Sequence, residues 1–268
     1  MAWGRQQDVD ELHLLVPDAE GLLARRATQF CSPPRIWRVD GRSLRQANAA
    51  PLPEPDPLEP EIAELARVIA AAGAAPVVEH GVLVGEVEGL EVARVVRTEE
   101  GVRLEVGVGR HDREAFQMLH GDMPKAQALA AVIATVQEHR RPGAEPHPLN
   151  RLAAERWLRA SLIADPSIMG ATALLPLSPP MPRTNLKEAV PASAVGTDVD
   201  GRDLLVVCSV GIDLDLVPTA ADVRLAAALP AARLVLAVPE RDDHPVTRAL
   251  AEMLIEPAEV LPVPFKRA

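Results

Sequence analysis

Five aspartates crowd the two ends of one predicted β-strand, and carboxylates grouped in this way could hold a divalent cation. They are Asp198, Asp200, Asp203, Asp213 and Asp215. Mg²⁺ prefers carboxylate oxygens, so one interpretation is a metal site for phosphate chemistry. The structural interpretation is a tight turn at residues 198–201 and a helix start after Asp213, because aspartate accepts hydrogen bonds from backbone amides at both places. The turn chemistry favours the structural interpretation.

The elements that would position these aspartates alternate regularly in the second half of the chain. Residues 203–212 (DLLVVCSVGI) form a continuous apolar run between turn residues, which is typical of a strand buried on both faces. Helices are predicted at residues 217–229 and 245–255, and further strands at 234–238 and 260–263. This order predicts right-handed crossovers and a largely parallel α/β sheet.

The same half begins with an amphipathic helix at residues 151–163, which contains AAERWLRASL and is followed by DPSIMG. After a proline-rich loop at 176–182 come GTDVDGRD, the strand LLVVCSV, a helix and the strand LVLAVPE. This arrangement resembles the PD-(D/E)XK nuclease superfamily, most nearly the catalytic domain of NucS-type DNA endonucleases. The resemblance covers roughly residues 151–263. It implies a restriction-endonuclease-like unit over residues 150–268, with a mixed sheet flanked by helices.

The resemblance also implies where catalysis would occur. In that family, carboxylates on two adjacent strands hold a divalent cation, and a nearby lysine assists. Placing Gly201 on the family's turn glycine puts Ser193 at the metal-binding aspartate. Cys208 then falls on the strand acid and Val210 on the lysine. None of the three can perform the original chemistry, and the helix acid Glu155 cannot hold an ion alone.

We therefore expect a catalytically degenerate nuclease-like protein that acts as a binding or regulatory scaffold, possesses no cofactor and is associated with DNA transactions. The alternative is a divergent Mg²⁺-dependent DNA endonuclease. Its candidate catalytic residues are Glu155, Asp198, Asp200 and Asp213. A second alternative is a small-molecule-binding α/β protein with a site at Ser209 and Gly211, since open α/β sheets bind ligands beyond the carboxyl ends of their strands. A strand-exit bend is the structural interpretation of Gly211.

Arg156 and Arg159 flank Trp157 on the predicted helix and are the other candidate binding residues. They could line a phosphate-binding edge, or they could form the wet face of an amphipathic helix, which is the commoner arrangement. Trp157 is expected to anchor a core or an interface. The nuclease-like resemblance further implies a protein partner or self-association.

The first half, residues 1–142, is predicted to be a separate α/β or α+β unit. It begins with a strand, a helix and a second strand, and residues 47–60 (ANAAPLPEPDPLEP) form a proline-rich connection. The remaining predicted elements are a helix at 61–72, three strands at 77–87, 90–96 and 102–108, and two helices. Residues 140–149 are a second linker, which separates the two units.

Composition restricts the partners. A net charge of −10 and an aromatic content of 2% disfavour a general nucleic-acid binder, which uses Lys and Arg for phosphates and aromatic rings for base stacking. The two cysteines are too far apart in sequence for a typical cysteine-based zinc site. Neither a run of about 18 apolar residues nor a signal-peptide core is present, so we expect no membrane association and a cytoplasmic protein.

Overall fold

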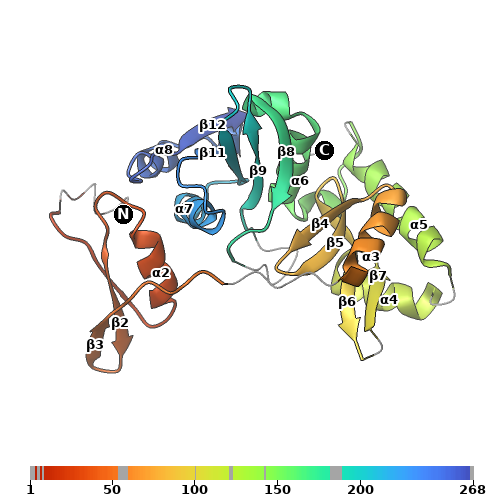
Figure 1. The fold of residues 1–268 in the computed structure, drawn as a ribbon, viewed down its shortest axis with the longest axis horizontal. Helices are drawn as coiled ribbons and strands as arrows, with labels where there is room; N and C mark the ends of the chain where they lie inside the picture. Colours follow the sequence, from red (N-terminus) through yellow and green to blue (C-terminus); the bar gives the residue numbers. More distant parts are fainter. Residues whose placement is uncertain are drawn as a thin grey trace.

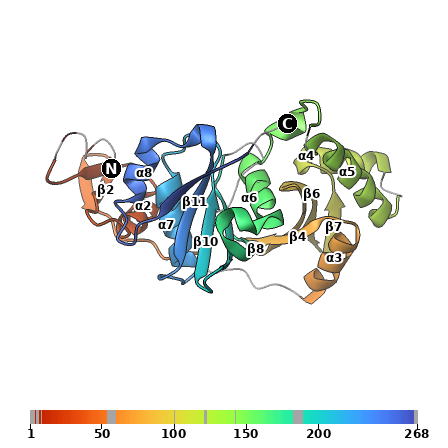
Figure 2. The same ribbon diagram turned by 90° about the horizontal axis from the view of Figure 1, so that it is seen from above.

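Over the residues that the structure describes, the protein is mixed α/β with three β-sheets (Figure 1 and Figure 2). The structure is a computed structural model. It describes residues 4 and 7 and residues 9–53, 60–99, 101–120, 123–141, 143–181 and 189–265. Each sheet lies in its own unit, and a central unit contacts the other two.

The central unit contains a five-stranded sheet in the order β12-β11-β10-β9-β8, in which Figure 2 labels β10 and Figure 1 the other strands. The strands are β8 (Ala171–Leu177), β9 (Ala192–Asp198), β10 (Asp203–Cys208), β11 (Arg233–Pro239) and β12 (Glu259–Val263). β8, β9 and β10 are antiparallel, whereas β10, β11 and β12 are parallel. The prediction of a largely parallel sheet holds only for the strands joined by helices, because a tight turn reverses the chain between β9 and β10.

Helices cover both faces of the central sheet. Helix α6 (Ala154–Ala164) packs on one face, where Leu158 and Leu162 contact a core that includes Val206. Helices α7 (Leu216–Ala226) and α8 (Pro245–Ala251) pack on the other face against residues such as Leu205 and Leu236. Strands β10 and β11 are therefore buried on both sides, as their continuous apolar runs predict.

The N-terminal unit is a small sheet of β1 (His13–Val16), β2 (Arg35–Asp40) and β3 (Ser43–Gln46) with helix α2 (Glu20–Ala27). It packs against α7 and α8 of the central unit, at the left of Figure 1. Phe30 enters the central core and forms an isolated β-bridge with Leu254. The first 50 or so residues of the predicted unit at 1–142 are therefore packed against the last 50 or so residues of the chain.

The third unit, here called the meander unit, is an antiparallel sheet in the order β4-β5-β6-β7. Its elements are α3 (Pro60–Ala71), β4 (Ala75–Glu79), β5 (Val82–Val87), β6 (Leu90–Thr98), β7 (Gly101–Val106), α4 (Gly109–His120) and α5 (Lys125–Arg140). The single strand predicted at 77–87 is wrong, since a hairpin turn divides it. His80 and Gly81 both have positive φ, 50° and 70°, as a two-residue turn between antiparallel strands requires.

The outer strands of two sheets, β4 and β8, lie next to one another (Figure 1 and Figure 2). Beside them, the amide of His80 donates to Ser178 Oγ at 3.1 Å. Residues 171–177 form a strand although Pro176 falls within it, because an outer strand tolerates a missing amide donor. None of the helices in the described ranges has the length and apolar character needed to cross a membrane.

The meander unit is held closely against α6 at the β5–β6 turn, formed by Glu88 and Gly89. Gly89 has φ +72°, and a Cβ there would lie 2.2 Å from the carbonyl carbon of Arg156. Only glycine fits this approach, so the turn fixes the distance between the meander unit and α6.

We expect Gly89→Ala to lower the free energy of unfolding by about 3 kcal/mol, through overpacking added to an unfavourable φ. Gly143→Ala is the matched control, because Gly143 has a similar φ of +78° with nothing within 4 Å of its Cβ position. Its expected cost is about 1 kcal/mol, the left-handed backbone term alone. Urea unfolding followed by circular dichroism measures both, and equal costs would refute close packing at Gly89.

Candidate functional site

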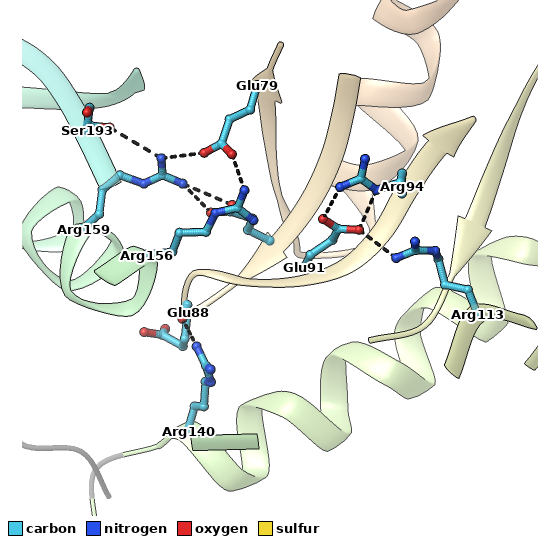
Figure 3. Close-up of polar contacts among 10 residues, drawn as sticks. Glu79, Glu88, Glu91, Arg94, Arg113, Arg140, Arg156, Arg159 and Ser193 are labelled. Carbon is cyan, nitrogen blue, oxygen red and sulfur yellow. Dashed lines mark hydrogen bonds and ion pairs between the residues drawn. The ribbon is translucent and has the colours of Figure 1, made fainter. Parts of the chain in front are cut away.

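Four charged side chains meet between α6 and the meander unit, and we call them the junction cluster (Figure 3). Arg159 contacts Glu79 Oε1 at 2.9 Å through Nη1 and Glu86 Oε2 at 2.9 Å through Nη2. Arg156 Nη1 lies 3.2 Å from Glu86 Oε1, and its Nη2 bonds the other oxygen of Glu79. Each arginine thus bridges both carboxylates.

Local structure explains why these side chains meet. Arg156 and Arg159 are three residues apart on α6, so they project from the same face of the helix. Glu79 and Glu86 come from the two strands of one hairpin, β4 and β5. The hairpin turn at His80 and Gly81 is therefore needed to present both acids to one helix.

The junction cluster is almost fully removed from water, with Arg156 4% and Arg159 1% exposed. Burial raises the pKa of Glu86, against the attraction of Arg159 and Arg156. Burial also acts to lower the pKa of Arg159, but the combined attraction of Glu86 and Glu79 outweighs it and raises that pKa. Arg159 therefore stays charged, and losing one of its partners would leave buried charge poorly compensated.

This burial corrects the expectation for the two arginines. Neither Arg156 nor Arg159 lies on a wet face of α6, and their guanidinium groups face carboxylates rather than solvent. Trp157, between them, is buried as expected and makes an edge-on contact with Phe265. The expectation failed because the acids that neutralise the arginines stand more than 70 residues earlier in the chain.

The structure does not bring Ser193 and Cys208 together on one face of the sheet. Directly opposed residues of antiparallel strands share a face, and Ser193 is opposite Val207 while Cys208 is opposite Ala192. Val207 belongs to the core beneath α7, whereas Cys208 and Ala192 belong to the core beneath α6. A shift of one residue between strands moves a side chain to the other face, which turn matching alone does not detect.

Glu155 does lie near Cys208. Burial raises the pKa of the Cys208 thiol to about 12, with a smaller opposing effect of Arg159 and a small added effect of Glu155. Val210 packs against the same core as Cys208. The α6 face of β10 therefore carries a neutral thiol and apolar groups. The charged groups of α6 that act on this thiol are Glu155 and the paired Arg159.

Asp198 and Asp200 are brought together, but an arginine already lies between them. Asp198 Oδ1 accepts the amides of Asp200 at 3.0 Å and Arg202 at 2.9 Å, as a tight turn predicts. Arg202 Nη2 lies 2.9 Å from Asp198 Oδ2 and 2.8 Å from Asp200 Oδ2. Hydrogen bonds from the Arg202 amide and side chain, with that of the Asp200 amide, lower the pKa of Asp198.

Asp213 lies at the opposite end of β10 from Asp198 and Asp200. It follows the carboxyl end of β10, whereas Asp198 precedes the other end, so the strand separates them by about 20 Å at roughly 3.3 Å per residue. Its Oδ1 accepts the amide of Asp215 at 2.8 Å just before α7, which agrees with a helix start. Burial raises the pKa of Asp213. Within the described ranges, His, Cys, Asp and Glu form no group of three or more suited to a metal ion.

The candidate ligand site at Ser209 and Gly211 has its backbone amides already engaged. The Ser209 amide donates to the carbonyl of Ala237 at 3.1 Å, and the Gly211 amide donates to Asp242 Oδ2 at 2.8 Å. Gly211 has φ +92°, which is the backbone of a bend at the strand exit.

Several buried charges were not recognised from the sequence. Besides Glu79 and Glu86, the acid Glu91 on β6 is 1% exposed and binds Arg94 and Arg113, each at 2.8 Å (Figure 3). The available signal was the placement of Glu86 and Glu91 within otherwise apolar strands. An acid at such a position needs a cationic partner in the folded chain.

No protein-family model, curated protein or solved structure matches this chain. Its function therefore has to follow from the arrangement of its own side chains.

We expect Arg159→Met to lower the free energy of unfolding by about 3–5 kcal/mol, because the two carboxylates would lose one of the two arginines that bridge them. Arg110→Met is the control, since Arg110 forms an exposed pair with Glu114 and should give no measurable change. Urea unfolding measures both. A loss below about 1 kcal/mol for Arg159→Met would contradict a tightly coupled junction.

We expect one thiol per native chain to react with a disulfide reagent at pH 8. With a pKa of about 12, only about one Cys208 in 10,000 is ionised there, and the thiolate is the reactive form. Cys31 is exposed and should react, so Cys31→Ser should abolish labelling of the native protein. Both cysteines should react in denaturant. Rapid labelling of native Cys31→Ser would show that Cys208 is accessible.

Proposed function

We propose that this protein is a nuclease-like protein without hydrolytic activity, which acts as a binding or regulatory scaffold. The order of elements in the central unit supports the resemblance to PD-(D/E)XK nucleases. A helix (α6) precedes three antiparallel strands (β8, β9 and β10), and a second helix (α7) leads to a strand parallel to the third (β11). Likeness of topology supports a common framework but does not assign an activity.

The observation that carries the proposal is the chemistry of the sheet face beneath α6. Hydrolysis of this kind needs a cation held by acids from adjacent strands, and here Cys208 faces Ala192. The nearby cation, Arg159, already has its charge satisfied by Glu79 and Glu86. The guanidinium of Arg159 and the apolar Ala192 opposite Cys208 both oppose metal binding at that position.

The binding part of the proposal is supported by the outer face of the N-terminal sheet. Helix α2 covers the face that holds Ile36, while Leu15, Trp37 and Leu44 belong to the opposite face. Leu15 is 53% and Leu44 54% exposed. Grouped exposed apolar side chains are typical of protein-contact surfaces. This favours a protein partner or a second copy over nucleic acid, which the net charge of −10 disfavours.

Plasmid nicking with Mg²⁺ or Mn²⁺, combined with calorimetric titration of each metal, tests the proposal. We expect neither cleavage nor saturable heat, because no group of three or more acids in the described part of the chain is arranged to hold the ion. Sedimentation velocity across a concentration series tests self-association in the same preparation. An exclusively monomeric chain would remove the second copy from the proposal and leave a different protein as the partner.

Cleavage would favour the competing Mg²⁺-dependent endonuclease. Asp200→Asn identifies its source, because Asp200 adjoins Asp198 in the one place where two candidate acids meet. Cleavage that requires Asp200 would overturn the proposal, and Arg202→Gln, which removes the cation between these acids, would then raise metal affinity. Asp203→Asn, at the start of β10, is the matched control for a nearby carboxylate.

A further inference from the structure

Two short helices of this protein begin with the same three-residue arrangement of histidine, proline and an aliphatic residue. His147 precedes η1 (Pro148–Arg151), and His244 precedes α8. In each case the histidine Nδ1 accepts the backbone amide two residues later, from Leu149 at 3.3 Å and from Val246 at 3.2 Å. An imidazole nitrogen can accept this bond only while it carries no proton.

One of the two caps has an additional feature. The ring of His147 lies against the ring of His139, near the end of α5, with centroids 3.7 Å apart and planes 4° from parallel. Two neutral imidazoles can stack at this distance, whereas two imidazolium ions so placed would repel each other. Protonation therefore opposes the cap and the stack together. His244 takes part in no ring stack found in the described residues, so it provides an internal comparison.

The capped segment connects the meander unit to α6. Leu149, whose amide His147 binds, accepts a hydrogen bond from Arg140 Nη2 through its carbonyl at 2.8 Å. Arg140 also binds the carbonyls of Glu88 and Leu152, and its guanidinium carbon lies 4.6 Å from the Trp157 ring centroid. Figure 3 shows Arg140 reaching from α5 to Glu88. One arginine thus joins α5, the β5–β6 turn and the entrance to α6.

Several charged residues lie in the elements around the histidine pair. None of the ion pairs found among the described residues includes His139 or His147. The charged residues of the same segment are Glu138, Arg140, Arg141, Glu145 and Arg151. On the strands packed beneath α5, Glu86 is committed to the α6 arginines and Glu91 to Arg94 and Arg113. The carboxylate of Glu88, in the β5–β6 turn, attracts Arg140. Burial lowers the pKa of Arg140 to about 10, so it remains a cation beside the pair.

We propose that the stacked His139–His147 pair, with the cap on Leu149, is a proton-sensitive latch that holds the connection between the meander unit and α6. At neutral pH, unprotonated Nδ1 of His147 accepts the Leu149 amide and the rings stack. In acid, each imidazole takes up a proton, the amide loses its acceptor and the two cations separate. The open connection binds more protons than the closed one, so falling pH favours opening. This latch is independent of the proposed scaffold function.

Hydrogen exchange measured by mass spectrometry at pH 7.5 and pH 5.5, corrected for intrinsic exchange rates, tests the latch. For peptides covering residues 143–153 of the wild-type chain, we expect protection to fall about fivefold to tenfold at the lower pH, the range that loss of one cap allows. His147→Asn should keep protection at both pH values, because an asparagine side chain caps a helix without titrating. His139→Phe, which keeps a stacked ring without its charge, should reduce the fall.

His244→Asn is the matched control, since it replaces the equivalent cap on α8. It should leave the fall in residues 143–153 unchanged and alter only peptides from residues 244–251. Equal protection of the wild-type segment at both pH values would overturn the latch. So would a fall that persists in His147→Asn, or one that keeps its full size in His139→Phe, because the proposal requires both rings.

Discussion

Buried arginine–carboxylate contacts hold this molecule together, and the relative positions of its units depend on them. On one side of the central sheet, Arg156 and Arg159 of α6 bind two acids of the meander unit. On the other side, Asp222 of α7 is fully buried and binds Arg25 and Arg26 of the N-terminal unit at 2.9 and 3.0 Å. Breaking either contact would strongly destabilise the fold, because a buried charge without a partner costs far more free energy than a missing apolar contact.

Through these contacts, helix α6 connects two units, whereas its position in the central unit suggests that it covers a catalytic site. In the nuclease-like interpretation, the helix and the neighbouring strands enclose a cation-binding site. Here Arg156 and Arg159 of α6 contact the β4–β5 hairpin, while a strand position close enough to feel the charge of Glu155 carries the thiol of Cys208. Under the proposed function, residues of a catalytic framework have become residues of an intramolecular interface. The protein would then recognise partners through outer surfaces and keep this interior for its own assembly.

The elements with strong local signals could be predicted from the sequence, and their contacts could not. Strands β10 and β11 and helix α7 were placed within a few residues because their apolar runs and turn residues are unambiguous. The turn that divides residues 77–87 was not predicted, because positive φ at a residue other than glycine is uncommon and the turn begins at His80. Strand β8 was missed because Pro176 suggested a loop.

The candidate site was harder to predict than the elements. The turn role of Asp198 and the helix-start role of Asp213 follow from neighbours within four residues, so they were within reach of sequence analysis. Arg156 and Arg159 were expected on the wet face of an amphipathic helix, whereas their observed partners, Glu79 and Glu86, stand more than 70 residues earlier in the chain. Their partners are fixed only by the fold, as are the contacts that join residues 25 and 26 to Asp222.

The placement of β4 beside β8 has a consequence for solubility. Each is an edge strand of its sheet, and an edge strand presents unpaired backbone amides and carbonyls to any chain that approaches it. While the meander unit and the central unit are in contact, their edge strands β4 and β8 shield one another. If the two units separated, both edge strands would become templates for association with other chains, with little loss of helix or strand content. A weakened contact between the units would therefore first appear as turbidity of the protein solution on storage.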